Sequence, residues 1–207
     1  MSGEVVHFAE QASPEVLDQV AKRLNDRNME AIVVADATRA REVVFERIPA
    51  GAEVHAGKSK SLLDIGVTAE LAVEGRYNYL RNVYMKMDRQ TQMREIRKLI
   101  AAPDFMLGSV SALTQDGILV VASATASQLG PYSAGGGKVI LVVGSQKIVP
   151  DLGSAFARIR EYVLPWENSQ VRAALGTDSF VGKILIIERE WVAGRITVVL
   201  VRQPVGI

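Results

Sequence analysis

The sequence predicts an α/β fold in which a mainly parallel sheet is flanked by helices and an antiparallel hairpin stands at the C-terminal end. Strand-like and helix-like segments alternate over most of the 207 residues, which is typical of parallel strands joined by helical crossovers. Lys138–Gly144 (KVILVVG) is the clearest buried strand. Lys183–Ile187 and Arg195–Val201 are strand-like runs around the turn Ala193-Gly194, and this pattern predicts the hairpin.

The N-terminal part alternates helix and strand. A helix begins after the N-cap Ser13, with a proline as its first residue, and its apolar stripe extends to Leu24. Ala31–Ala35 (AIVVA) is typical of a buried strand, Thr38–Phe45 of the helix that follows it, and Glu53–Ala56 of a second strand.

The middle of the chain continues this alternation. The loop Gly57–Ser61 (GKSKS) precedes a short helix, Leu62–Gly66, which a glycine ends. Apolar residues at helical spacing predict helices over Asp88–Ala101 and Asp151–Leu164, and Asp104–Val121 contains strand-like runs around an Asp-Gly turn.

We expect one domain over residues 1–207. It would have an N-terminal helical segment at about 1–28, an α/β core at about 29–165, and a C-terminal helix and hairpin at about 166–207. The N-terminus lacks the basic and apolar regions of a signal peptide, and no apolar run reaches the roughly 18 residues of a membrane span. A cytoplasmic protein without membrane contact is therefore expected.

Composition excludes several kinds of site. The chain has no cysteine, which excludes disulfides, cysteine-ligated metals and a cysteine nucleophile. Its two histidines, His7 and His55, leave little for a metal site, so none is expected. The near balance of 24 Lys+Arg against 23 Asp+Glu argues against nucleic acid as a partner. Because the glycines lack the dinucleotide-binding spacing, a nicotinamide cofactor is not indicated and the cofactor stays unassigned.

The GKSKS loop is a candidate anion site. Ligands of α/β sheets bind beyond the carboxyl ends of strands, and this loop joins a strand to a helix. Backbone N–H groups there, together with two lysines and two hydroxyls, would hold a phosphate or carboxylate. The candidate residues are Gly57, Lys58, Ser59 and Ser61. The alternative is a solvated loop in which Ser59 or Ser61 caps the helix.

Two further loops extend this candidate site. Ser123–Gly137 is rich in small residues that let a backbone approach a ligand, and Thr125, Ser127 and Gln128 would hydrogen-bond it. A tightly packed helix before a glycine turn explains the segment equally well. Lys147, in the loop after the clearest strand, would neutralise an anion, and the alternative is an ordinary surface lysine.

No catalytic residue can be assigned. His55 ends a strand beside the GKSKS loop, where it would serve as a general acid or base or play only a structural part. Neither a Ser-His-Asp arrangement nor a carboxylate pair is recognisable, and whether the protein is an enzyme stays open.

Four segments together resemble one family, the LUD domain or lactate-utilisation protein C-like family. They are HAGKSKSLLDIG, FMLGSVSALTQDGILVVAS, KVILVVGSQKIVPDLGSAFARI and KILIIEREWVAGRITVVLVRQPVGI, which extend over nearly the whole chain. The resemblance implies a fold like the NagB/RpiA/CoA-transferase group. It also implies a link to the oxidation of L-lactate alongside iron–sulfur partner subunits.

Two features of the chain depart from what this resemblance implies. Many members carry an Asn-Arg loop where this chain reads SATASQLG, so the polar contacts would come from Thr125, Ser127 and Gln128. No position matches the catalytic glutamate of the CoA transferases.

Three functions fit these observations. The first is binding of a small anionic metabolite of the carboxylate, phosphate or CoA type in lactate or organic-acid utilisation. The second is a non-catalytic sensor or docking subunit of an iron–sulfur oxidoreductase system. The third is a nucleotide-dependent ligase like the formyltetrahydrofolate cyclo-ligases of the same fold group. A homodimer is also expected, through pairing of the apolar strand Ile196–Val201 across a two-fold axis.

Overall fold

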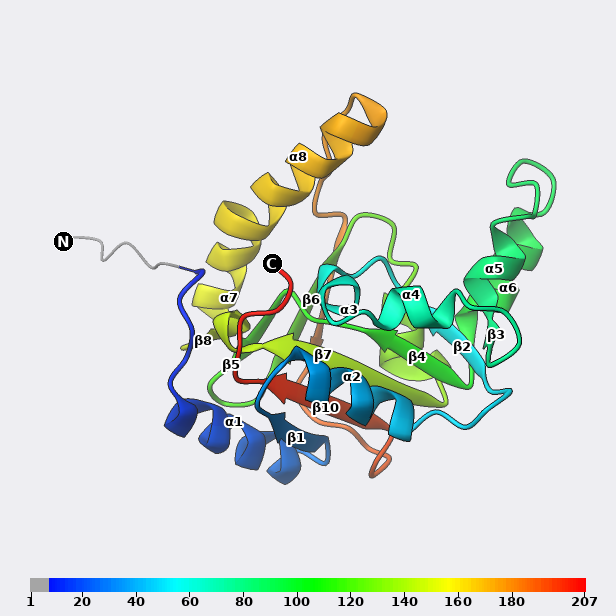
Figure 1. The fold of residues 1–207 in the computed structure, drawn as a ribbon. Helices are drawn as coiled ribbons and strands as arrows, with labels where there is room; N and C mark the ends of the chain where they lie inside the picture. The colour runs from blue at the N-terminus through cyan, green and yellow to red at the C-terminus, as the bar shows by residue number, and fades with distance from the viewer. Residues whose placement is uncertain (1–7) are drawn as a thin grey trace.

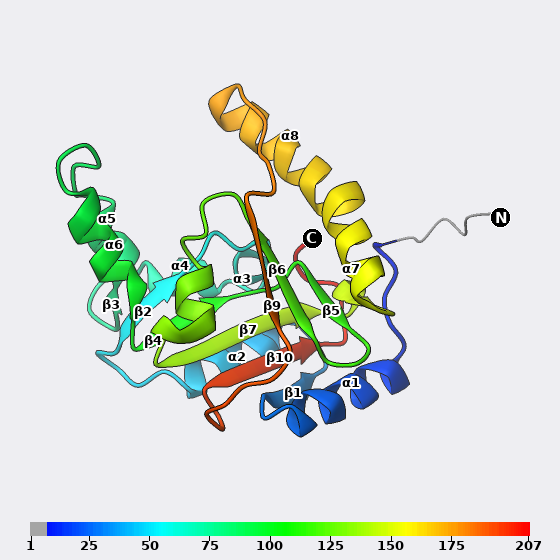
Figure 2. The same cartoon turned by 180° about the vertical axis from the view of Figure 1, so that it is seen from behind.

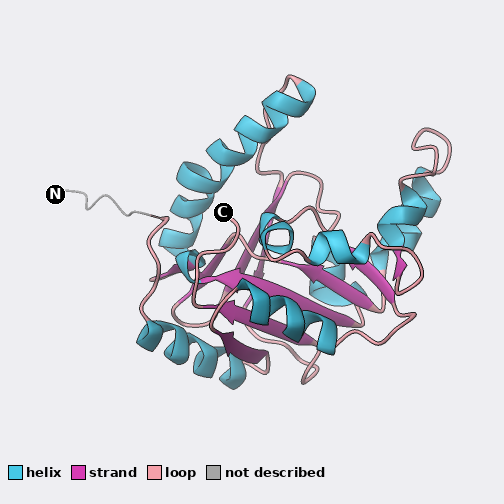
Figure 3. Cartoon of the chain, viewed as in Figure 1, coloured by secondary structure: helices cyan, strands magenta, loops and turns pink. Residues whose placement is uncertain are grey.

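The structure, a computed structural model, describes residues 8–207, so His7 lies outside the described residues. Figure 1 and Figure 3 show strands packed between helices, with α8 and the α5–α6 pair projecting from the body. The helices are α1 (Pro14–Asp26), α2 (Ala37–Glu46), α3 (Lys60–Asp64), α4 (Val67–Leu71), α5 (Leu80–Tyr84), α6 (Met93–Ala101), η1 (Pro131–Gly135), η2 (Ser145–Lys147), α7 (Leu152–Arg158), η3 (Ile159–Val163) and α8 (Leu164–Leu175). The strands are β1 (Glu30–Val34), β2 (Glu53–Ala56), β3 (Asn78–Tyr79), β4 (Phe105–Gly108), β5 (Ala112–Thr114), β6 (Leu119–Ser123), β7 (Lys138–Gly144), β8 (Ile148–Val149), β9 (Lys183–Ile187) and β10 (Ile196–Val201).

The main sheet has six parallel strands in the order β1-β10-β7-β4-β2-β3. A second sheet, in the order β8-β5-β6-β9, mixes parallel and antiparallel pairs. The predicted α/β class with a mainly parallel sheet flanked by helices is therefore confirmed. No helix within residues 8–207 has the length and apolar character needed to cross a membrane.

The two faces of the main sheet carry separate hydrophobic clusters. Along β7, Val139, Leu141 and Val143 pack with α1 and the second sheet, whereas Ile140 and Val142 pack with α2, α3 and α4. This alternation follows from the two-residue period of a strand. Figure 2 shows the second sheet lying across the face of the main sheet opposite α2.

The predicted C-terminal hairpin is wrong. Both of its strands form, but β9 pairs antiparallel with β6 at the edge of the second sheet, and β10 lies between β1 and β7. Every residue of β10 is buried, and strands of this kind favour the centre of a parallel sheet. Since both edges of β10 are occupied, it cannot pair with a second copy, and a homodimer would need another surface.

Two helices begin or end at other residues than the sequence predicts. The helix expected from Asp88 begins only at Met93, because the Asp88 carboxylate accepts bonds from Gln90 N–H and Thr91 Oγ1 in a local turn. The helix expected to end at Leu164 instead continues through the π-helical turn η3 into α8, the C-terminal helix. The N-cap Ser13 is confirmed, since its hydroxyl accepts the Val16 N–H at 3.4 Å.

Candidate functional site

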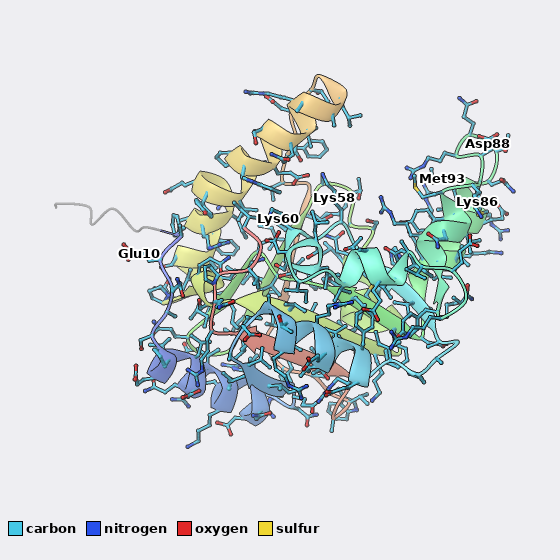
Figure 4. The ribbon with its side chains drawn as sticks, in the orientation of Figure 1. Glu10, Lys58, Lys60, Lys86, Asp88 and Met93 are labelled. Carbon is cyan, nitrogen blue, oxygen red and sulfur yellow. The ribbon has the colours of Figure 1, made fainter. Side chains whose placement is uncertain are left out.

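A cavity of about 560 Å³ opens at the carboxyl edge of the main sheet. Its polar wall comes from the end of β6 and the segments that follow β2, β4, β6 and β7, and its apolar wall from η3, α8 and the segment after α8. In Figure 4 the labelled Lys58 and Lys60 stand at α3, on the side facing α8. The polar wall includes residues 57–60, 109–111, 122–125 and 127–128 with Lys147, and the apolar wall includes Ile159, Val163, Leu164, Trp166, Val171, Leu175, Phe180 and Val181.

The residues that the sequence singles out come together around this cavity. Seven of the eight line it, namely Gly57, Lys58, Ser59, Thr125, Ser127, Gln128 and Lys147. The eighth, Ser61, is only 1% exposed and lies beneath the wall, where its hydroxyl accepts a bond from Lys147. The GKSKS loop and Lys147 converge because they follow β2 and β7, parallel strands whose carboxyl ends share one edge. Thr125, Ser127 and Gln128 instead follow β6 of the second sheet, which packs on the face of the main sheet.

Lys147 is not a surface lysine. It ends η2, directly after β7, and is 3% exposed. Its Nζ donates to Ser61 Oγ at 3.0 Å, to Ser109 Oγ at 3.0 Å and to the Val110 carbonyl at 3.2 Å. Desolvation lowers the pKa of Lys147 from 10.5 to about 7, helped by the positive charge of Arg158 and opposed by Asp64.

Ser109 is a site residue that the sequence reasoning missed. It follows β4 and borders the cavity, and its hydroxyl donates to the Val142 carbonyl at 2.6 Å. The backbone before it is tightly enclosed, because a Cβ on Gly108 would lie 1.6 Å from the Tyr132 hydroxyl oxygen. Only glycine fits there. The sequence did offer a signal for Ser109, because it directly follows a strand, and Lys147 was chosen as a candidate for a similar position after a strand.

Arg158 was also missed, because it lies within a helix. It is fully buried at the end of α7 and donates from Nη1 to the Ser111 carbonyl. Within residues 8–207 its Nε and Nη2 have no hydrogen-bond partner. Burial lowers the pKa of Arg158 to about 10.

Lys147 and Arg158 therefore form an unusual pair of buried cations. Neither forms an ion pair with a carboxylate in the described part of the chain. Buried charges normally have such partners because desolvation of an isolated charge is costly. An anion in the cavity would reduce this cost for Lys147, which borders the cavity, whereas Arg158 lies behind the lining residues.

The remaining predicted residues have local partners. Ser59 caps α3 by accepting the Leu62 N–H at 3.3 Å, as the structural alternative for this loop predicted. Lys58 Nζ lies 3.4 Å from Glu167 Oε1 and so links the loop to α8. Ser127 Oγ lies 3.4 Å from both Thr125 Oγ1 and Gln128 Oε1.

His55 plays a structural part in this arrangement. It is 3% exposed, does not line the cavity, and meets the Tyr84 ring edge-on at 5.8 Å between centroids. Burial, with a smaller effect from Arg81, lowers the pKa of His55 to about 4.

The comparisons with known proteins identify the family. The LUD domain family model matches residues 17–201, and the chain therefore belongs to the LUD domain family. None of the curated proteins matches the sequence. Among solved structures, the crystal structure of a DUF162 family protein from Deinococcus radiodurans is similar, with a TM-score of 0.56 and 14% identity. The similarity covers 93% of this chain and 99% of that chain and, at this identity, concerns the fold alone.

Proposed function

We propose that this LUD-domain protein binds a small anionic metabolite in the cavity beside α8, and that the metabolite is lactate, a related organic acid or its CoA-type derivative. The observation that carries the proposal is the convergence of three separately predicted loops on one cavity that borders a buried lysine. In its protonated form Lys147, which has no carboxylate partner within residues 8–207, is suited to hold a carboxylate or phosphate, and a bound anion would favour that form.

The two walls of the cavity indicate the form of the ligand. Hydroxyls, amides and lysines line one wall, whereas Trp166, Val171 and Phe180 belong to the other. That second wall also carries the carboxylates of Glu167 and Asp178, which are paired with Lys58 and Arg172. A cavity of about 560 Å³ lies within the usual range for a small-molecule site. The ligand would therefore combine an anionic head with an apolar part that lies against α8.

Ligand-dependent thermal unfolding tests this proposal. The panel contains lactate, pyruvate, short acyl-CoA thioesters, sugar phosphates and ATP with magnesium. A ligand at 100 times its Kd should stabilise the protein by about 2.7 kcal/mol. Stabilisation by ATP alone would instead favour the cyclo-ligase alternative.

Two matched lysine variants locate the binding site. Lys58→Ala should weaken the stabilisation, because Lys58 borders the cavity. Lys86→Ala should leave it unchanged, because Lys86 is an exposed lysine on the separate α5–α6 projection (Figure 4). Equal weakening in both variants, or no stabilisation by any compound, would refute binding at this site.

One observation favours the second candidate function, a docking subunit of an iron–sulfur system. Strand β9 is an edge strand with Ile186 38% exposed, and Trp191, shortly after it, is 95% exposed. Exposed apolar edges are suited to pairing with another chain. If this edge docks a partner, Trp191→Ser should weaken binding to the candidate iron–sulfur subunit in calorimetry, and unchanged affinity would argue against it.

A further inference from the structure

We propose that Ser109 and Lys147 form a nucleophile–base pair that hydrolyses an ester or thioester bound in the cavity. This inference rests on the proposed function for its binding site, but it adds a reaction and names the reacting atoms. The substrate class becomes an activated acyl derivative of a small organic acid.

The contact between the two side chains is direct. Lys147 Nζ lies 3.0 Å from Ser109 Oγ, which is within the reach of a general base. In the structure the Ser109 hydroxyl donates to the Val142 carbonyl. Rotation of the O–H bond alone would direct the proton to Nζ, provided that the amine is neutral.

The surroundings favour the neutral amine. Lys147 is enclosed by hydroxyls and a carbonyl, with the charged groups Arg158 and Asp64 acting on it from α7 and α3. Burial and Arg158 disfavour the ammonium form, and Asp64 favours it more weakly. The result, a pKa of about 7, gives a substantial neutral fraction at physiological pH.

Ser109 rather than Ser61 is the nucleophile. Both hydroxyls contact Lys147, but only Ser109 borders the cavity. Ser61 is covered by the C-terminal segment, where a Cβ on Gly206 would lie 2.2 Å from its Oγ. Ser61 Oγ lies 3.2 Å from Ser109 Oγ, so Ser61 is a positioning residue.

The reaction balances without a metal or redox partner. Lys147 takes the proton from Ser109 Oγ as this oxygen bonds to the acyl carbon, and the bond from that carbon to the leaving alcohol or thiol breaks. The leaving group takes the proton from Lys147. Water then attacks the acyl-serine with Lys147 again accepting a proton, the acid departs, and Ser109 Oγ recovers its hydrogen.

Labelling with a fluorophosphonate probe, which reacts with activated serine hydroxyls, tests whether Lys147 activates Ser109. The native protein should be labelled at Ser109, as read by peptide mass spectrometry, and protein unfolded in urea should not. Ser109→Ala should abolish labelling, whereas Ser133→Ala, which changes an exposed serine outside the cavity, should leave it intact. Lys147→Met should slow labelling by about 100-fold or more, and Ser61→Ala by less.

The pH dependence of labelling provides a readout on the unmodified protein, so the proposal does not depend on whether a variant folds. The labelling rate should rise through a midpoint near neutral pH and level off above it. Absence of label at Ser109, or a rate without this rise, overturns the pair. If ligand-induced stabilisation persists while Ser109 is unreactive, the binding site stands and the reaction does not.

Discussion

Replacing Lys147 with methionine should change how the stability of the protein depends on pH. Methionine is similar in length and carries no charge, so the variant removes the buried amine and largely keeps the packing. In the folded protein the pKa of Lys147 is about 7, against 10.5 for the ordinary side chain. A tenfold change in proton affinity corresponds to about 1.4 kcal/mol, so the full difference between the two pKa values is worth about 5 kcal/mol.

The direction in which stability changes with pH follows from the number of protons that the folded and unfolded states bind. Between pH 7 and pH 10.5 the unfolded chain holds the lysine proton and the folded protein does not, so stability rises with pH through this window. Below pH 7 both states are protonated and the folded protein bears the whole desolvation penalty. Between pH 6 and pH 10 the wild type should therefore gain about 4 kcal/mol relative to Lys147→Met.

Urea unfolding at a series of pH values, followed by tryptophan fluorescence, measures this difference. Subtracting the two proteins cancels groups that titrate equally in both, and the lost hydrogen bonds contribute a constant that does not depend on pH. The exposed Lys86→Met variant provides the control for loss of a lysine at the surface. A pH-independent difference for Lys147→Met would refute both the lowered pKa and the premise of a neutral base.

Three other substitutions test buried contacts of the fold. Because the pKa of His55 is about 4 when folded and 6.5 otherwise, lowering the pH through this window should cost the wild type about 3 kcal/mol, and His55→Leu should remove that loss in acid unfolding titrations. Arg195→Met should cost about 3–5 kcal/mol in urea unfolding, because it leaves Glu190, 2.6 Å away, buried without its partner. Gly108→Ala should lower stability by about 1–3 kcal/mol through overlap with the Tyr132 hydroxyl, and Tyr132→Phe should recover part of the loss when the two are combined.

The elements of the fold were largely predictable because their signals are local. The N-cap Ser13, the strand Lys138–Gly144 and the two C-terminal strands all lie where residue type and spacing placed them. The α/β class follows from their alternation along the chain, and the LUD resemblance agrees with the family match over residues 17–201. The proximity of the GKSKS loop and Lys147 was also predictable from the edge rule for parallel strands, whereas the loop after β6 joins them through the packing of the second sheet.

The pairing of β9 and β10 was decided by tertiary structure. A turn between two strand-like runs favours a hairpin locally, but β10 has apolar side chains on both faces. Burial of both faces in the centre of the main sheet is worth more than a local turn, at roughly 25 cal/mol per Å² of apolar surface. Local sequence patterns contain no measure of the surface that β10 buries between β1 and β7, so they favour the hairpin.

By itself the sequence determined the element types, the fold class and the two loops, after β2 and β7, that meet at one edge of the main sheet. Only the tertiary structure decided that Lys147 is buried rather than exposed, and that it lies against Ser61 and Ser109 with Arg158 nearby. The physical reason is that a lowered pKa and a hydroxyl 3.0 Å from an amine depend on side chains from three distant parts of the chain, near residues 61, 109 and 147–158. Local patterns encode strands and helices, whereas the chemistry of this site arises where their ends are packed together.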